Sequence, residues 1–206
     1  MNSSAKIRNL TRIAILVAVI FLLSFIRPLK LTLVQIPVIV GATLLGRVAG
    51  VVLGFFFGLS EYIQALEGAQ ILTTTALNMD HVLFVFVCFV PRILTGWITA
   101  LLAAKFKRNS EKRKNTAKKS DGRVLHHSLT GFFGSLLNTI LYLGFLYLLF
   151  RDALAQTNTT DGGTLVFILV LFFVFGIPEA IISAVVVPAV CRAMEVIFRR
   201  LPAPKH

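Results

Sequence analysis

The sequence predicts an all-α integral membrane protein with six transmembrane helices and with both termini in the cytoplasm. The chain has 206 residues, of which 56% are hydrophobic, and its mean hydropathy is +0.83, whereas soluble domains are about 45–50% apolar. The apolar residues are gathered into long blocks, and a helix needs about 20 consecutive apolar residues to cross a bilayer. Most of the net charge of +12 lies in short stretches between these blocks, as expected if the blocks lie in lipid and the stretches in water.

Six apolar segments follow from this criterion, and we expect residues 1–206 to form a single membrane domain. The segments comprise residues 8–27, 34–46, 48–66, 81–105, 124–151 and 164–199. The first follows basic residues as a signal peptide does, but no small-residue cleavage site comes after it, so we expect a retained helix. The second is short, and Pro37 falls in its first turns, where proline is tolerated; we do not expect it to cross the membrane as a regular helix. The sixth contains Pro178 and Pro188, which predict a kink or an interfacial extension.

The distribution of Lys and Arg predicts the orientation. Residues 106–123, after the fourth segment, are densely basic and lack apolar periodicity, so we expect a solvated linker there. Both ends of the chain are also basic, and six crossings place them on the same side as this linker, which the positive-inside rule assigns to the cytoplasm. The connections 60–80 and 151–163 carry acidic residues and are expected to face outward. Nucleic-acid binding is an alternative explanation of the linker, but a topology signal with attraction to anionic lipid explains it better.

Two patterns of small residues predict close helix packing. Glycines recur every four residues in the third segment, at positions 46, 50, 54 and 58, and form a smooth stripe that another helix backbone can approach. Ala14 and Ala18 form a small-xxx-small pair in the otherwise bulky first segment. On the pattern alone, internal packing is the more frequent explanation of this pair, and a docking face for another membrane protein is the alternative.

Ionisable residues deep in a membrane are costly, so each marks a candidate functional site. Arg92 lies eleven residues after His81, which corresponds to about 16 Å of helical rise and places it near mid-membrane. In the fifth segment Asn138 and Tyr142 share one face, and in the sixth Glu179 follows Pro178. We expect three helices to bring Arg92, Asn138 and Glu179 to comparable depths.

Two hypotheses explain this group. The functional hypothesis is a polar pocket in the outer half of the bundle for a small polar solute, because the planar fork of Arg92 matches a carboxylate. Outer residues such as Glu61 and Tyr62 would then line or cover its mouth. The structural hypothesis is an ion pair between Arg92 and Glu179 that only fixes the helix arrangement.

Signatures of catalysis are missing from the sequence. It contains no G-x-S-x-G, no H-E-x-x-H and no phosphate-binding loop. Cys88 and Cys191 lack the spacing of a zinc site, and the pair His126–His127 is better explained as interfacial. We expect no catalytic residue, no metal and no cofactor, so that an ATPase driving uphill transport would be another chain.

Four blocks together resemble the substrate-binding S component of energy-coupling factor (ECF) vitamin transporters: LTLVQIPVIVGATLLGRVAGVVLGFFFGL, VPRILTGWITALLA, GFFGSLLNTILYLGFLYLLF and GIPEAIISAVVVP. The resemblance covers nearly the whole chain except the basic linker and the termini. It implies a six-helix bundle in the bacterial cytoplasmic membrane that binds a vitamin at its outer side. It also implies partners, namely a transmembrane coupling subunit and two cytoplasmic ATPases.

The resemblance also implies roles for individual residues. The stretch from Ala14 to Ala18 matches the A-x-x-x-A motif by which S components dock on the coupling subunit. The P-R-I-L-x-G and G-S-L-x-N-T blocks look most like those of pantothenate-type members, which implies that Arg92 and Asn138 contact the ligand. We expect Glu179, Tyr142 and Tyr62 to complete the binding site.

Other functions remain open at this stage. The family also includes S components for riboflavin, folate and hydroxymethylpyrimidine or thiamine, which share much of the scaffold. A structural membrane protein with an internal Arg–Glu brace is a second class. A stand-alone secondary carrier is a third, although no pair of matching interrupted helices occurs in the two halves of the sequence.

Overall fold

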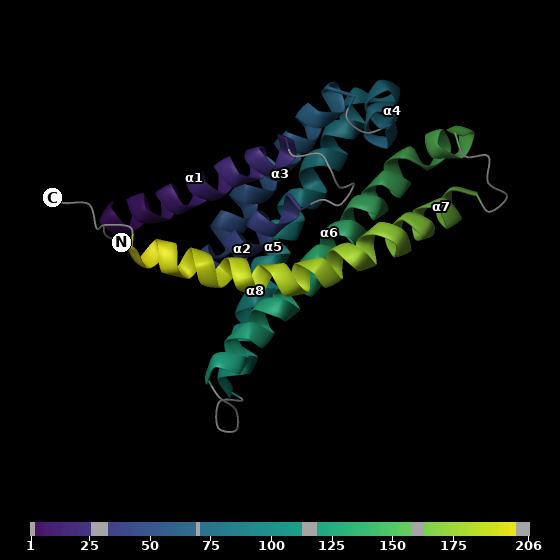
Figure 1. Ribbon diagram of the computed structural model, residues 1–206. Helices are drawn as coiled ribbons and strands as arrows, with labels where there is room; N and C mark the ends of the chain where they lie inside the picture. Colours follow the sequence, from purple (N-terminus) through teal and green to yellow (C-terminus); the bar gives the residue numbers. More distant parts are fainter. Residues whose placement is uncertain (1–2, 26–32, 69–70, 113–118, 158–162, 201–206) are drawn as a thin grey trace.

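All regular secondary structure in the described residues is helical, and each of the six expected segments contains a helix (Figure 1). The structure is a computed structural model, which describes residues 3–25, 33–68, 71–112, 119–157 and 163–200. The helices are α1 (Ser3–Phe25), α2 (Gln35–Leu45), α3 (Arg47–Leu66), α4 (Ile71–Met79), α5 (His81–Lys112), α6 (Lys119–Thr157), α7 (Gly163–Leu171), the π-helical turn η1 (Phe172–Gly176) and α8 (Ile177–Arg200). By length and composition, five stretches among them could cross a membrane. The prediction of an all-helical, multi-pass membrane protein is thereby confirmed, whereas six crossings and the orientation stay predictions.

Two expected connections contain more helix than the sequence indicated. Within residues 60–80, α3 continues to Leu66 and α4 adds a separate short helix. The linker 106–123 is also largely helical, because α5 continues to Lys112 and α6 begins at Lys119; residues 113–118 lie outside the described part. Lys, Arg and Glu are good helix formers, so a helix that starts in an apolar segment continues through basic sequence when its backbone stays hydrogen-bonded.

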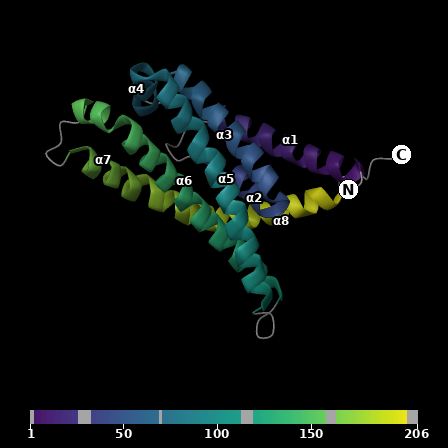
Figure 2. The same ribbon diagram turned by 180° about the vertical axis from the view of Figure 1, so that it is seen from behind.

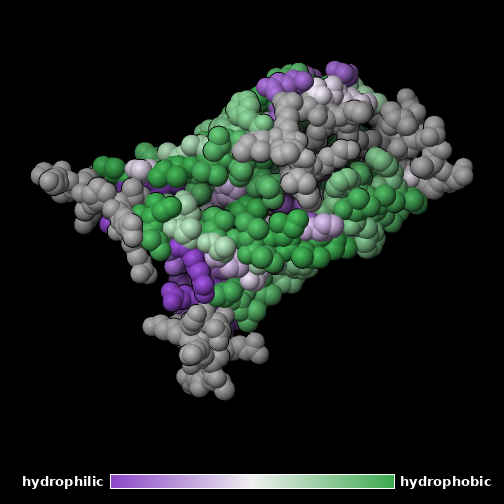
Figure 3. Space-filling view, in the orientation of Figure 1, coloured by the Kyte–Doolittle hydropathy of each residue, from purple (hydrophilic) through white to green (hydrophobic). Residues whose placement is uncertain are grey.

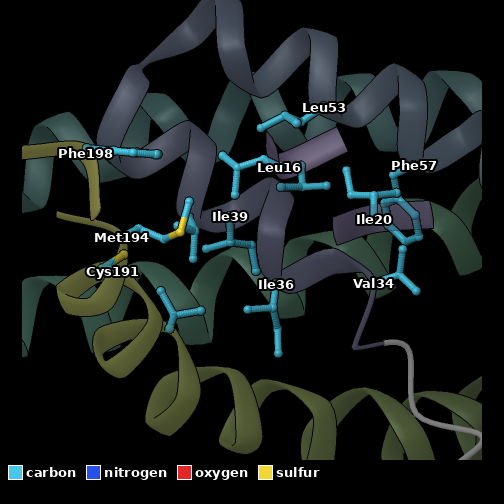
Figure 4. Packing of buried hydrophobic residues seen from close by; sticks show 13 residues of the cluster. Leu16, Ile20, Val34, Ile36, Ile39, Leu53, Phe57, Cys191, Met194 and Phe198 are labelled. Carbon is cyan, nitrogen blue, oxygen red and sulfur yellow. The ribbon is translucent and has the colours of Figure 1, made fainter. Parts of the chain in front are cut away.

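Helix α2 lies at the centre of the bundle and packs against α1, α3, α5, α6 and α8. Its 11 residues rise about 16 Å, which is too short for a hydrocarbon core of about 30 Å. Residues 35–42 are all buried, and the apolar cluster around them draws side chains from α1, α2, α3 and α8 (Figure 4). Ile20, Ile39 and Leu53 in this cluster are fully buried. The short apolar segment is thus a core helix.

The remaining long helices are neighbours in a fixed order: α3 packs on α5, α5 on α6, and α6 on α8 (Figures 1 and 2). Glycines set the contact between α3 and α5. A β-carbon on Gly50, Gly54 or Gly58 would collide with the backbone of α5 at Gly96, Arg92 or Cys88 respectively. The predicted stripe is confirmed at these three positions. Gly46 has another role, since its φ of +90° makes the corner between α2 and α3.

The last segment runs from α7 through η1 into α8 without a break (Figure 1). A proline has no N–H and its ring crowds the carbonyl four residues earlier, and π-turns are one way in which helices absorb such a defect. The π-helical turn ends two residues before Pro178. We therefore attribute the predicted irregularity to Pro178, whereas Pro188 lies inside α8.

The first helix, α1, contacts the end of the last helix, α8. The guanidinium of Arg12 on α1 donates a hydrogen bond to the carbonyl of Phe198 on α8, with an N–O distance of 3.3 Å, and lies 4.8 Å from the centre of its ring. Much of the face shown in Figure 3 is apolar. Leu148, Val48 and Val185 are among the most exposed large hydrophobic residues. An exterior of this kind suits a lipid environment.

Candidate functional site

Arg92 is held in the interior by contacts of its backbone and by two aromatic rings that contact its guanidinium. Its carbonyl lies against Gly54 of α3, where a β-carbon would not fit. Its guanidinium carbon lies 4.1 Å from the ring centre of Tyr142 on α6 and 5.0 Å from that of Phe57 on α3. The side chain is only 2% exposed. Aromatic faces attract a cation most strongly when water is excluded, so this position holds a rigid, buried positive charge.

The ion-pair partner of Arg92 is Glu61, through Nη2 of the arginine and Oε2 of the glutamate. The structural hypothesis named Glu179 as the partner of Arg92 and did not include Glu61. The observed pair corrects the placement of Glu61 in an outer connection. Because α3 continues to Leu66, Glu61 lies one helical turn after Phe57, and side chains four residues apart share a helix face. That spacing was the signal in the sequence that could have identified Glu61.

Two contacts establish the register between α5 and α6. Arg92 contacts Tyr142, and Thr99 lies against Gly134. Because the later residue of α5 contacts the earlier residue of α6, the two helices are antiparallel. Thr95 and Asn138 therefore lie at the same level, between these two contacts. Both are buried. The structure thus brings together Arg92, Tyr142 and Asn138 of the predicted site.

Glu179 belongs to a neighbouring group of polar residues. Gln35, at the start of α2, donates a hydrogen bond from Nε2 to Oγ of Ser135 at 2.8 Å and another to Oε2 of Glu179 at 3.4 Å. Ser135 lies one turn before Asn138 on the same face of α6. The two groups are therefore adjacent. Sequence reasoning missed Gln35, whose signal is a lone amide at the start of an apolar run.

Several buried polar atoms in this region have no hydrogen-bond partner among the described residues. Apart from Oε2 of Glu61, which is ion-paired with Arg92, they are Nε and Nη1 of Arg92, Oδ1 of Asn138, Oε1 of Gln35, and the hydroxyl oxygens of Thr95 and Thr99. An unpaired buried polar atom costs about 1–3 kcal/mol, so a group of them indicates a place that a ligand or water completes. Arginine supplies donors, amide oxygens accept, and hydroxyls do both. The arrangement suits a small solute with an acidic group and with hydroxyl or amide groups.

Tyr62 does not contact Arg92. Its hydroxyl lies 2.6 Å from Nε2 of His81, and its ring packs edge-to-face on that histidine and beside Phe84. Asp80 accepts hydrogen bonds from the N–H groups of residues 82 and 83 and thereby caps α5. These residues join the end of α3 to the start of α5, at the end of the bundle nearer to Glu61.

Ala14 and Ala18 are both exposed, whereas Leu16 and Ile20 of the same helix are buried. Internal packing therefore does not explain the alanine pair.

His126 and His127, expected at an interface, are buried, and the described residues contain no group of three or more metal-binding side chains. A cavity of about 420 Å³ lies between the start of α6 and the second half of α8, beside His127 and Arg192. None of the predicted solute-binding residues lines it.

Comparison with known proteins gives two findings. The family described as "ECF transporter, substrate-specific component" matches residues 8–191, which include every predicted site residue. The chain is also 28% identical over 179 residues to the pantothenic acid transporter PanT of Lactococcus lactis subsp. cremoris (strain MG1363). That match covers 81% of this chain and 80% of the relative.

Proposed function

Since the chain belongs to the family of ECF transporter substrate-specific components, we propose that it binds pantothenate for an ATP-driven importer of the bacterial cytoplasmic membrane. The observation that carries this proposal is the buried Arg92 with two unpaired nitrogens, because these N–H donors match the oxygen acceptors of an acidic ligand. The vitamin is supported by the PRILTG and GSLLNT blocks and by the similarity to a pantothenic acid transporter.

The chemistry of pantothenate matches the residues that surround Arg92. Its carboxylate would bind the guanidinium, which the ring of Tyr142 holds in place. Its hydroxyl and amide N–H groups would donate to the unpaired Oδ1 of Asn138. Glu179 would act through the adjacent group that Gln35 links to α6. Tyr62 would form part of the entrance, where it is half-buried beside His81.

We propose in addition that Ala14 and Ala18 dock on the transmembrane coupling subunit of an ECF module with two cytoplasmic ATPases. Their exposure supports this, because a small-residue surface allows another helix backbone to approach closely. The chain itself has no phosphate-binding loop, so energy would come from the ATPases.

The test is to identify the small molecule that the purified protein binds. Mass spectrometry of compounds retained in detergent, followed by calorimetric titration with pantothenate, riboflavin, folate and thiamine, should single out pantothenate. Saturable binding of another vitamin without binding of pantothenate would refute the choice of vitamin and keep the transport role.

A structural role is the second candidate, and the buried pair of Arg92 and Glu61 favours it. Under that hypothesis the pair only braces α3 against α5. The purified protein would then bind none of the four vitamins, while loss of either charge would lower its melting temperature.

A further inference from the structure

We propose that Glu61 is a resident carboxylate, which occupies Arg92 in the empty protein and is displaced by the carboxylate of the solute. This rests on the proposed function, in which Arg92 binds the acidic group of a vitamin. It adds a residue that determines specificity: Glu61 sets how strongly the site prefers an acidic solute over a neutral one.

Of the two partners, the glutamate side chain is the more exposed. Arg92 is 2% exposed, contacts two aromatic rings, and has its backbone against Gly54. Glu61 is 13% exposed and lies five residues before the end of α3. In the proposed exchange its side chain rotates toward the end of the helix, where the carboxylate would reach water, while Arg92 stays in place. A solute that enters from this end therefore meets Glu61 first.

The position of Glu61 on the guanidinium decides what a solute must do. Arginine binds a carboxylate most strongly with two parallel N–H groups. Both two-nitrogen edges of the side chain, Nη1 with Nη2 and Nε with Nη2, include Nη2, because Cδ blocks the edge between Nε and Nη1. Glu61 contacts Nη2, and the other two nitrogens have no partner among the described residues. A solute carboxylate that binds with two hydrogen bonds must therefore share Nη2 with Glu61.

Nη2 has one N–H on each edge, so hydrogen bonding alone would admit both carboxylates. Two carboxylates at one buried positive charge, however, leave a net negative charge out of water and repel each other, so the solute displaces Glu61 instead of binding beside it. The exchange replaces one carboxylate by another and keeps the charge of Arg92 paired throughout. A neutral solute offers Arg92 only a dipole, which does not compensate for loss of the ion pair. Glu61 thereby stabilises the empty site and excludes neutral analogues.

The test compares pantothenate with its alcohol analogue pantothenol, which lacks the carboxylate, in wild type and in Glu61→Gln. Glutamine keeps the size of the side chain but removes the competing charge. We expect the variant to bind pantothenate roughly tenfold more tightly, which corresponds to 1.4 kcal/mol. We expect its affinity for pantothenol to change less than twofold. Glu67→Gln is the matched control, because it removes an exposed carboxylate from the same end of α3 and should leave both affinities unchanged.

Equal or weaker binding of pantothenate by folded Glu61→Gln would overturn the proposal, since Glu61 would then be a solute contact or a brace. If glutamine prevents folding, Glu61→Asp withdraws the carboxylate by one methylene, and it should also bind pantothenate more tightly than wild type. Wild-type protein that binds no pantothenate would refute the proposed vitamin and this inference together. Wild-type binding that Arg92→Ala weakens, combined with no gain in Glu61→Gln, refutes the inference alone.

Discussion

Arg92 combines three constraints: a backbone packed against Gly54, contacts with two aromatic rings, and an ion pair with Glu61. If this group binds the acid of the solute, its loss removes a charged partner from a buried site, which typically costs about 2–5 kcal/mol. We therefore predict that Arg92→Ala weakens pantothenate binding by more than tenfold. Arg92→Lys should recover only part of it, because an ammonium keeps the charge but loses the fork. Calorimetric titration measures both, and Arg192→Ala, at an exposed arginine near the end of α8, should leave the affinity unchanged.

The pair with Glu61 leads to a second prediction, on stability. Breaking a buried pair by removing one partner costs about 3–5 kcal/mol, because it leaves an uncompensated charge. Arg92→Ala should therefore lower the melting temperature of the empty protein, and addition of Glu61→Gln should restore much of it. The double variant should still bind pantothenate weakly, since the guanidinium is absent. Recovery of affinity as well as stability would show that Arg92 does not bind the solute.

At this scale the sequence predicts which residues are unusual but not which of them meet. A guanidinium inside an apolar run is conspicuous, and its burial with Tyr142 and Asn138 follows from helix periodicity. Its partner depends on where α3 ends and on how α3 and α8 are rotated about their axes. Glu61 was assigned to a connection for the first reason, and its pairing with Arg92 was missed for the second. Neither quantity is set by local sequence.

Helix α3 approaches α5 through glycines, and this contact places Arg92. A β-carbon on Gly54 would collide with the carbonyl of Arg92, so the two helices must separate or shift. We predict that Gly54→Ala destabilises the protein by about 1–3 kcal/mol, as overpacking commonly does, and weakens pantothenate binding because the guanidinium moves. Gly144→Ala is the control, since a β-carbon at that helical glycine meets nothing within 4 Å. It should be neutral or stabilising by up to about 1 kcal/mol, as thermal unfolding will show.

Apolar blocks and glycine spacing were sufficient to locate the long helices and the stripe on α3. Helix α4 was missed because its nine residues include three consecutive threonines and lie between polar residues, a composition that local propensity does not favour. The basic extensions of α5 and α6 were missed because hydropathy marks where a membrane ends, not where a helix ends. Both errors concern segments at the edge of the bundle, where tertiary contacts and solvent decide the structure.

The molecule as a whole presents two kinds of surface on α1. Leu16 and Ile20 face the core, whereas Ala14 and Ala18 face outward, among the large apolar side chains that cover much of the exterior (Figure 3). A smooth patch has no evident advantage against lipid, whose chains pack on leucine equally well. Against a protein helix a smooth patch does have an advantage, because only small side chains let two backbones approach closely.

Replacement of Ala14 and Ala18 together by tryptophan should therefore block assembly with the coupling subunit. Both positions are exposed, so the new side chains need not disturb the core, and pantothenate binding by the isolated subunit should persist. Leu148→Trp is the matched control, because it adds a similar ring at an exposed position on α6 and should assemble normally. Co-purification of each variant with the coupling subunit and the two ATPases measures the effect. Normal recovery of the complex with the alanine variant would refute docking through this pair, since two indole rings cannot fit between closely packed backbones.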